Sequence, residues 1–93
     1  MLNLIVLRSK DIEKSATLYG MLGLEFSLHS HGNGPGHYSA QDGSIVFEIY
    51  PVSERSGSST GTRVGFSVLD VDATFDALVS LGAKALSVPK DSE

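Results

Sequence analysis

The stretch that decides the fold is residues 11–26, DIEKSATLYGMLGLEF, which predicts a helix followed by a strand. Ser9 or Asp11 can cap the helix, and Glu13 adds negative charge to the first turn, where the helix dipole favours it. Apolar residues recur on one helix face, at Ile12, Ala16, Tyr19 and Leu22. Gly23 stands where a left-handed cap is expected, so the helix should end there.

A second stretch, residues 70–82, repeats this pattern at an offset of 59 positions. Asp70 matches Asp11, and Gly82 matches Gly23. Both blocks open on an acid, a β-branched residue and a second acid, and both close on Leu-Gly. Self-similarity at one fixed offset indicates an internal repeat, so the second block should also form a helix.

Strands are expected on both sides of each helix. Residues 2–7 form a short apolar run, which predicts a strand buried on both faces. Alternation and turn signals predict further strands at 25–30, 37–41, 45–50, 63–69 and 85–88. Within 45–50, the residues Val46, Glu48 and Tyr50 share one face. A single domain over residues 1–93 follows, with a first unit at 1–52, a Ser/Gly-rich linker at 53–62 and an incomplete second unit at 63–93.

Composition narrows the function classes. The 93 residues suffice for one small domain. The absence of cysteine excludes disulfides and a thiol nucleophile, and it favours a reducing, cytoplasmic location. The net charge is −4 with no basic cluster, so nucleic acid is not an expected partner. No apolar run approaches the roughly 20 residues that span a bilayer, so no membrane partner is expected either.

The repeat also sets an expected length. Two complete units at this offset need about 118 residues, whereas the sequence has 93. The last two strands of the second unit are therefore expected to lie beyond residue 93, which is the favoured interpretation. The alternative is that another copy of the chain covers the exposed sheet edge.

Residues 11–19 and 22–26 resemble the first-helix signature of the vicinal oxygen chelate superfamily, the glyoxalase, bleomycin-resistance and extradiol-dioxygenase group. Residues 64–68, 70–73 and 81–84 are similar to its second-unit signature. The resemblance implies an α+β fold in which paired βαβββ units curl their mixed sheet into a cup, with the helices outside. The competing fold is ferredoxin-like, βαββαβ, which fits the length but leaves one strand surplus.

The resemblance also implies a metal site in some members, at four cup-facing positions on the first and fourth strands of each unit. There the metal chelates two neighbouring oxygens of the substrate. Leu4 stands at the first of these positions and cannot bind a metal. Arg63 stands at its repeat position, and a guanidinium offers a metal no lone pair. Only Glu48 matches the ligand type, so no metal or other cofactor is expected, with a divalent metal as the alternative.

Glu48 lies between two large apolar residues, where an acid is disfavoured by strand propensity. In a dry cup it would need a partner. One interpretation pairs it with Arg63, a second leaves it in solvent on an open sheet face, and a third keeps it as a metal ligand. His37 is the best general-base candidate if its loop folds over the cup, so Glu48 and His37 are the catalytic candidates.

The remaining histidines allow a different metal site. His29 and His31 are two residues apart, and with Glu48 or His37 they could bind a metal. The alternative is a pair of exposed histidines beside a hairpin. Residues 32–36, which lie between His31 and His37, are predicted to be a hairpin connection or a lid at the cup mouth. Tyr38 is a further candidate for lining a pocket.

Three functions remain open. The first is binding of a small molecule in the cup without the usual metal. The second is a metal-dependent lyase or dioxygenase with a rearranged site, and the third is a non-catalytic interaction protein. A homodimer is expected in each, because the resemblance implies cups built across two chains. The residues expected to contact a ligand are Leu4, Val46, Glu48, Tyr50 and Arg63.

Overall fold

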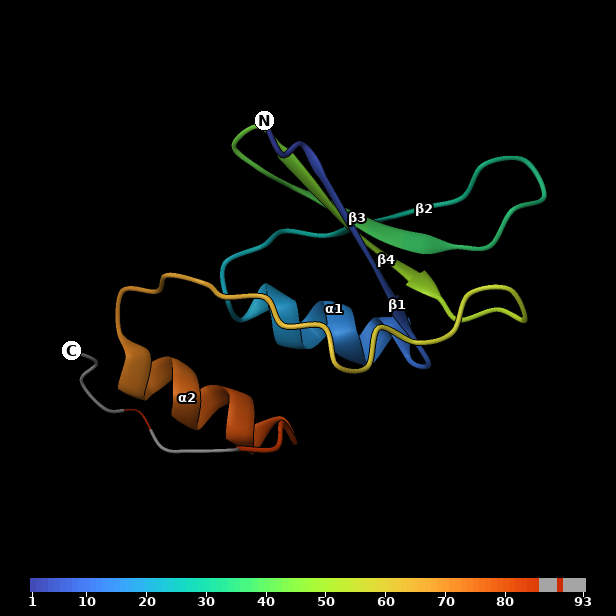
Figure 1. The fold of residues 1–93 in the computed structure, drawn as a ribbon. Helices are drawn as coiled ribbons and strands as arrows, with labels where there is room; N and C mark the ends of the chain where they lie inside the picture. Colours follow the sequence, from blue (N-terminus) through green and yellow to red (C-terminus); the bar gives the residue numbers. More distant parts are fainter. Residues whose placement is uncertain (86–88, 90–93) are drawn as a thin grey trace.

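A computed structural model describes residues 1–85 and residue 89 of the chain. Its six elements follow the chain in Figure 1 as β1 (Leu4–Ser9), α1 (Ile12–Gly20), β2 (Ser27–His29), β3 (His37–Asp42), β4 (Ile45–Pro51) and α2 (Val71–Ser80). The strand expected at 85–88 falls on residues 86–88, which lie outside the described part.

The four strands form one mixed, curled sheet in the order β1-β4-β3-β2. β1 runs parallel to β4, and the other two pairs are antiparallel. All four strands precede α2, whereas a ferredoxin-like chain places its second helix before its last strand. The predicted α+β class and the βαβββ order of the first unit are therefore confirmed.

The two helices have matching caps at the predicted 59-residue offset. Asp11 caps α1 by accepting a hydrogen bond from the Lys14 amide at 3.0 Å. Asp70 caps α2 in the same way, from the Ala73 amide at 2.9 Å. Gly23 and Gly82 follow the two helices with φ angles of 106° and 102°, a backbone region that favours glycine. The 59-residue offset is thus visible in caps and backbone angles as well as in residue types. None of the helices in the described part is long and apolar enough to cross a membrane.

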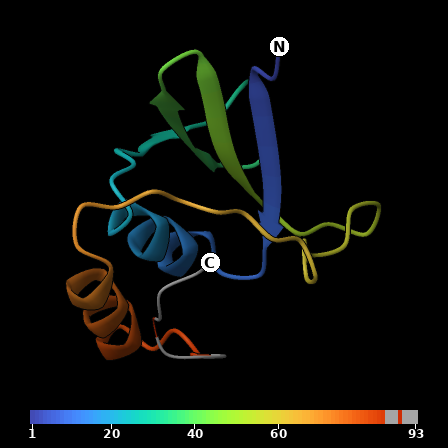
Figure 2. The same ribbon diagram turned by 60° about the vertical axis from the view of Figure 1, so that its left-hand side comes forward.

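The core lies between α1 and one face of the sheet. Its buried residues are Leu7, Leu24, Ala40, Phe47 and Ile49. The predicted stripe of α1, with Ile12, Ala16 and Tyr19, packs against them. Burial raises the pKa of the Tyr19 phenol above its usual value. Both helices lie on this side of the strands in Figure 2, so no helix of the described part covers the opposite face of the sheet, which is called the open face.

The open face corrects one expectation about β1. This strand was expected to be buried on both faces, but Leu4 is 48% exposed and Val6 is 40% exposed. Both residues point away from α1, and no element of the described part covers them. A continuous apolar run therefore marks a strand of this sheet without implying burial on both sides.

The strand expected at 63–69 is also not formed in the described part of the chain. Val64 and Phe66 instead pack on the core from the helix side, where the Phe66 ring lies 5.8 Å from that of Tyr19. The apolar alternation was real, but a strand also needs a hydrogen-bonded neighbour. The preceding linker lies along the end of β1, where the Arg8 amide donates to Ser59 Oγ at 2.8 Å.

The two helix caps, Asp11 and Asp70, are expected to contribute differently to the free energy of unfolding. Asp11→Ala should lower the free energy of unfolding by about 1 kcal/mol, because α1 covers the core. Asp70→Ala is the matched control and should leave that value nearly unchanged, because α2 is not among the elements that pack extensively on the sheet. Urea unfolding followed by circular dichroism measures both. Equal losses would show that α2 is part of the same cooperative unit.

Candidate functional site

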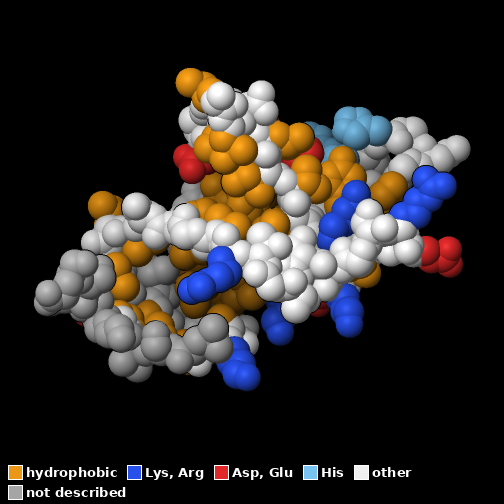
Figure 3. Space-filling view, in the orientation of Figure 1, with side chains coloured by type: hydrophobic (Ala, Val, Ile, Leu, Met, Phe, Trp, Pro, Cys, Tyr) orange, Lys and Arg blue, Asp and Glu red, His pale blue; other side chains and the backbone are white. Residues whose placement is uncertain are grey.

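The open face of the sheet carries three rows of side chains, because alternate residues of each strand point to the same side. The first, called the ring row, runs across all four strands as His29, His37, Tyr50 and Arg8. The second, called the acid row, consists of Ser27, Ser39, Glu48 and Val6. The third, called the end row, consists of Gln41, Val46 and Leu4. In Figure 3, histidine side chains lie beside hydrophobic side chains that gather over the strands.

The ring row is tightly stacked. The rings of His37 and Tyr50 lie 4.2 Å apart and within 6° of parallel. His31, from the loop before β3, lies 5.3 Å from His37 on its other side. The Arg8 guanidinium lies 5.0 Å from the Tyr50 ring centroid, a cation–π distance, and donates to the Pro51 carbonyl. His37 is consequently only 2% exposed although it belongs to the open face.

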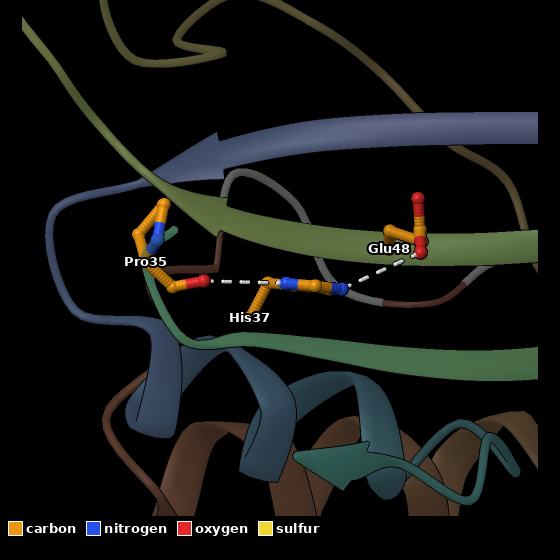
Figure 4. Close-up of polar contacts among 3 residues, drawn as sticks. All are labelled: Pro35, His37 and Glu48. Carbon is orange, nitrogen blue, oxygen red and sulfur yellow. Dashed lines mark hydrogen bonds and ion pairs between the residues drawn. The ribbon is translucent and has the colours of Figure 1, made fainter. Parts of the chain in front are cut away.

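His37 connects the ring row to Glu48 (Figure 4). Its Nδ1 lies 3.4 Å from the Pro35 carbonyl and donates to it in the tautomer that carries the proton on Nδ1. Its Nε2 lies 3.8 Å from Glu48 Oε2, too far for a hydrogen bond. This contact becomes an ion pair only when the ring is protonated. The histidine therefore holds the end of its loop on the sheet and lies beside the carboxylate.

Four of the five residues expected to contact a ligand lie on this face. Leu4 and Val46 are cross-strand partners, and Glu48 and Tyr50 follow along β4. Arg63 is exposed on the segment that packs from the helix side. No salt bridge joins Arg63 to Glu48 in the described part, and the structure pairs Glu48 with His37 instead.

Several residues of the face were missed at the sequence level. Arg8, Val6, Ser39 and Ser27 belong to it, and their signal was the period of two along each strand, counted from Leu4 or His37. Tyr38 was expected to line a pocket, and it lines a hollow on the helix side of the sheet, together with Phe26 and α1. Its ring packs edge-on against Phe26 at 6.3 Å on the helix side.

The donors on the face do not fit a metal centre. The cross-strand neighbours of Glu48 are Val6 and Ser39, and an aliphatic side chain cannot bind a metal. The ring centroids of His29 and His31 lie 6.1 Å and 5.3 Å from that of His37, and the ring planes are tilted to it by 30° and 33°. Within the described residues, no three His, Asp or Glu side chains form a group that could hold a metal.

Hollows in the described part of the chain lie on the helix side of the sheet. One of about 320 Å³ lies between the end of β1, α1 and the hydroxyl-rich residues 58–62. Another, of about 490 Å³, lies between the end of α1 and residues 64–67. A third, of about 480 Å³, lies between α1, Phe26 and Tyr38. None of the three is lined by Glu48 or His37.

Comparisons with known proteins give a matching family model and solved structures of similar fold. The model of the Glyoxalase/Bleomycin resistance protein/Dioxygenase superfamily matches residues 1–93. Hypothetical protein SA1046 from S. aureus has a similar structure, with a TM-score of 0.72 and 17% identity, over 100% of this chain and 78% of that one. The crystal structure of SMU.1112c has a TM-score of 0.61 and 22% sequence identity, and the match covers 98% of this chain and 81% of that one. A glyoxalase/bleomycin resistance protein/dioxygenase from Nocardioides has a TM-score of 0.53 and 17% sequence identity, and the match covers 99% of this chain and 68% of that one. The search of curated proteins gave no match.

Proposed function

This chain belongs to the Glyoxalase/Bleomycin resistance protein/Dioxygenase superfamily, and from that premise we propose that it binds a small organic molecule on the open face of its sheet. The proposal includes no metal, because Leu4 and Arg63 occupy positions where the family's metal ligands are expected. It concerns binding and not a reaction, since a catalytic step in the family's manner would be routed through that metal.

The observation that supports binding is the combination of groups on the face. The exposed side chains of Leu4 and Val6 and the half-buried Val46 form an aliphatic surface next to the half-buried carboxylate of Glu48. Small-molecule sites are mostly apolar, with a few fixed polar groups that orient the ligand. His37 and Tyr50 supply the rigidity, because their stacked rings leave β3 and β4 little freedom at this point.

A second copy of the chain is the proposed cover of the face. Leu2, Leu4 and Val6 are 60%, 48% and 40% exposed, an apolar strip of the kind that marks interaction sites. Closing the strip against a partner would turn an open surface into a cup. Native mass spectrometry should show a mass of twice 9.8 kDa, and a monomer at micromolar concentration would contradict this part of the proposal.

Binding is tested with 2-naphthylmethanol, a neutral, flat and apolar probe. Titration should shift the amide signals of β1 and β4 in ¹H–¹⁵N spectra and should saturate. Leu4→Asn should weaken binding at least about tenfold, or about 1.4 kcal/mol, because it removes apolar contact from the centre of the surface. Leu28→Asn is the matched control on β2, where the side chain is 62% exposed at the far edge of the sheet. Shifts confined to residues 58–67 would place binding in the helix-side hollows and contradict the proposal.

The lyase or dioxygenase alternative has less support from the geometry. It needs a rearranged metal site built from Glu48 and the histidines, and no three of those donors form a group that could hold a metal within the described residues. The same mass spectrometry tests it, because a retained divalent ion in the native protein would revive this alternative.

A further inference from the structure

We infer that the ligand of the open face is an organic cation, a protonated amine with an apolar body whose ammonium group pairs with Glu48. The inference rests on the proposed binding function and adds to it the chemical class of the ligand.

Glu48 is the only carboxylate in the three rows, and it lies at their centre. Its side chain is 21% exposed, so it has lost much of its water. Within the described residues it accepts no hydrogen bond, and the His37 ring, its one ion-pairing candidate there, stays at 3.8 Å. At 3.8 Å, His37 Nε2 donates no hydrogen bond to Glu48, whichever ring nitrogen carries the proton. A partly desolvated carboxylate without a donor is costly, and an ammonium with three donors would relieve that cost.

The cation already on the face does not meet this need. The Arg8 guanidinium lies over Tyr50 in the ring row, and its Nη1 donates to the Pro51 carbonyl. No ion pair joins Arg8 to Glu48 in the part of the chain that the structure describes. An anionic ligand would meet Glu48 at the middle of the face and be repelled. The charge of the site therefore discriminates between ligand classes.

The neighbours of Glu48 define the rest of the ligand. Val6 is its cross-strand partner on one side, and Ser39 is its partner on the other. Adjacent strands lie about 4.8 Å apart, and side chains on the same face recur about every 6.7 Å along a strand. An ammonium at Glu48 therefore places a body of one or two rings on Val6, Leu4 and Val46. The hydroxyl of Ser39 can accept another ammonium proton.

Three probes of equal shape test the charge. They are 2-naphthylmethylamine, 2-naphthylmethanol and 2-naphthoic acid, which at pH 7 are a cation, a neutral molecule and an anion. Titration calorimetry with the full chain should show the amine binding at least about tenfold more tightly than the alcohol, with the acid weakest. Glu48→Gln should remove the preference for the amine and leave the affinity for the alcohol within about twofold. Glu13→Gln is the matched control, since it makes the same charge change at an exposed position of α1.

The outcomes separate the inference of a cationic ligand from the proposed binding function. Equal binding of amine and alcohol would overturn the cation inference and leave the proposed function intact. A preference that survives in Glu48→Gln would overturn it too, because Glu48 would then not be the counter-ion. Failure of all three probes to bind would overturn the inference and the binding function together.

Discussion

Phe47→Ala is expected to lower the free energy of unfolding by about 3–5 kcal/mol, the usual cost of removing a buried phenylalanine ring. Phe47 is 3% exposed and lies at the centre of the core. Its ring centroid is 5.2 Å from that of Tyr19 and 6.1 Å from those of Phe26 and Phe66. Truncation would therefore remove contacts to α1, to the segment before β2 and to the segment after the linker.

A loss of this size is large for one small domain, because the whole stability of such domains is about 5–15 kcal/mol. Urea unfolding followed by far-ultraviolet circular dichroism measures it without tryptophan, which the chain lacks. Leu28→Ala is the control, since this side chain is 62% exposed and should change stability by less than about 0.5 kcal/mol. Coincident unfolding curves for Phe47→Ala and the unchanged protein would show that the core is not organised around this ring.

The sequence was most informative where one local rule determines the conformation. Asp11 and Gly23 bound the first helix, and their repeats Asp70 and Gly82 bound the second, because capping depends on residues within a few positions of each other. The two faces of β4 were also predicted correctly. Strict alternation put Phe47 in the core and Glu48 on the opposite side, and the structure keeps both there.

The sequence was less informative where a residue's surroundings depend on distant parts of the chain. The apolar run of β1 is the same whether Val6 is covered or open, so its exposure could not be read from residue type. Residues 63–69 alternate between apolar and polar residues like a strand, but a strand forms only where an adjacent strand edge is available for backbone hydrogen bonds. One interpretation of the sequence paired Glu48 with Arg63, whereas the register and the loop before β3 bring His37 to it.

His37→Ala is expected to lower the free energy of unfolding by about 2–3 kcal/mol, which is large for a residue on an open sheet face. The ring is 2% exposed between Tyr50 and His31, so its loss leaves a void that neighbouring side chains fill only in part. The Pro35 carbonyl also loses its contact with His37 Nδ1, which frees the end of the loop.

The matched control is His29→Ala, which removes the same side chain from the exposed end of the ring row. It should cost less than about 0.5 kcal/mol, because an exposed side chain leaves no void behind. A second measurement separates packing from loop attachment. Amide hydrogen exchange of residues 30–36 should speed up in His37→Ala more than that of β1, because the bond to Pro35 is local to the loop. Equal stability of the two variants would mean that His37 is not held in the stack, and the rigidity attributed to the face would then have to come from β4 alone.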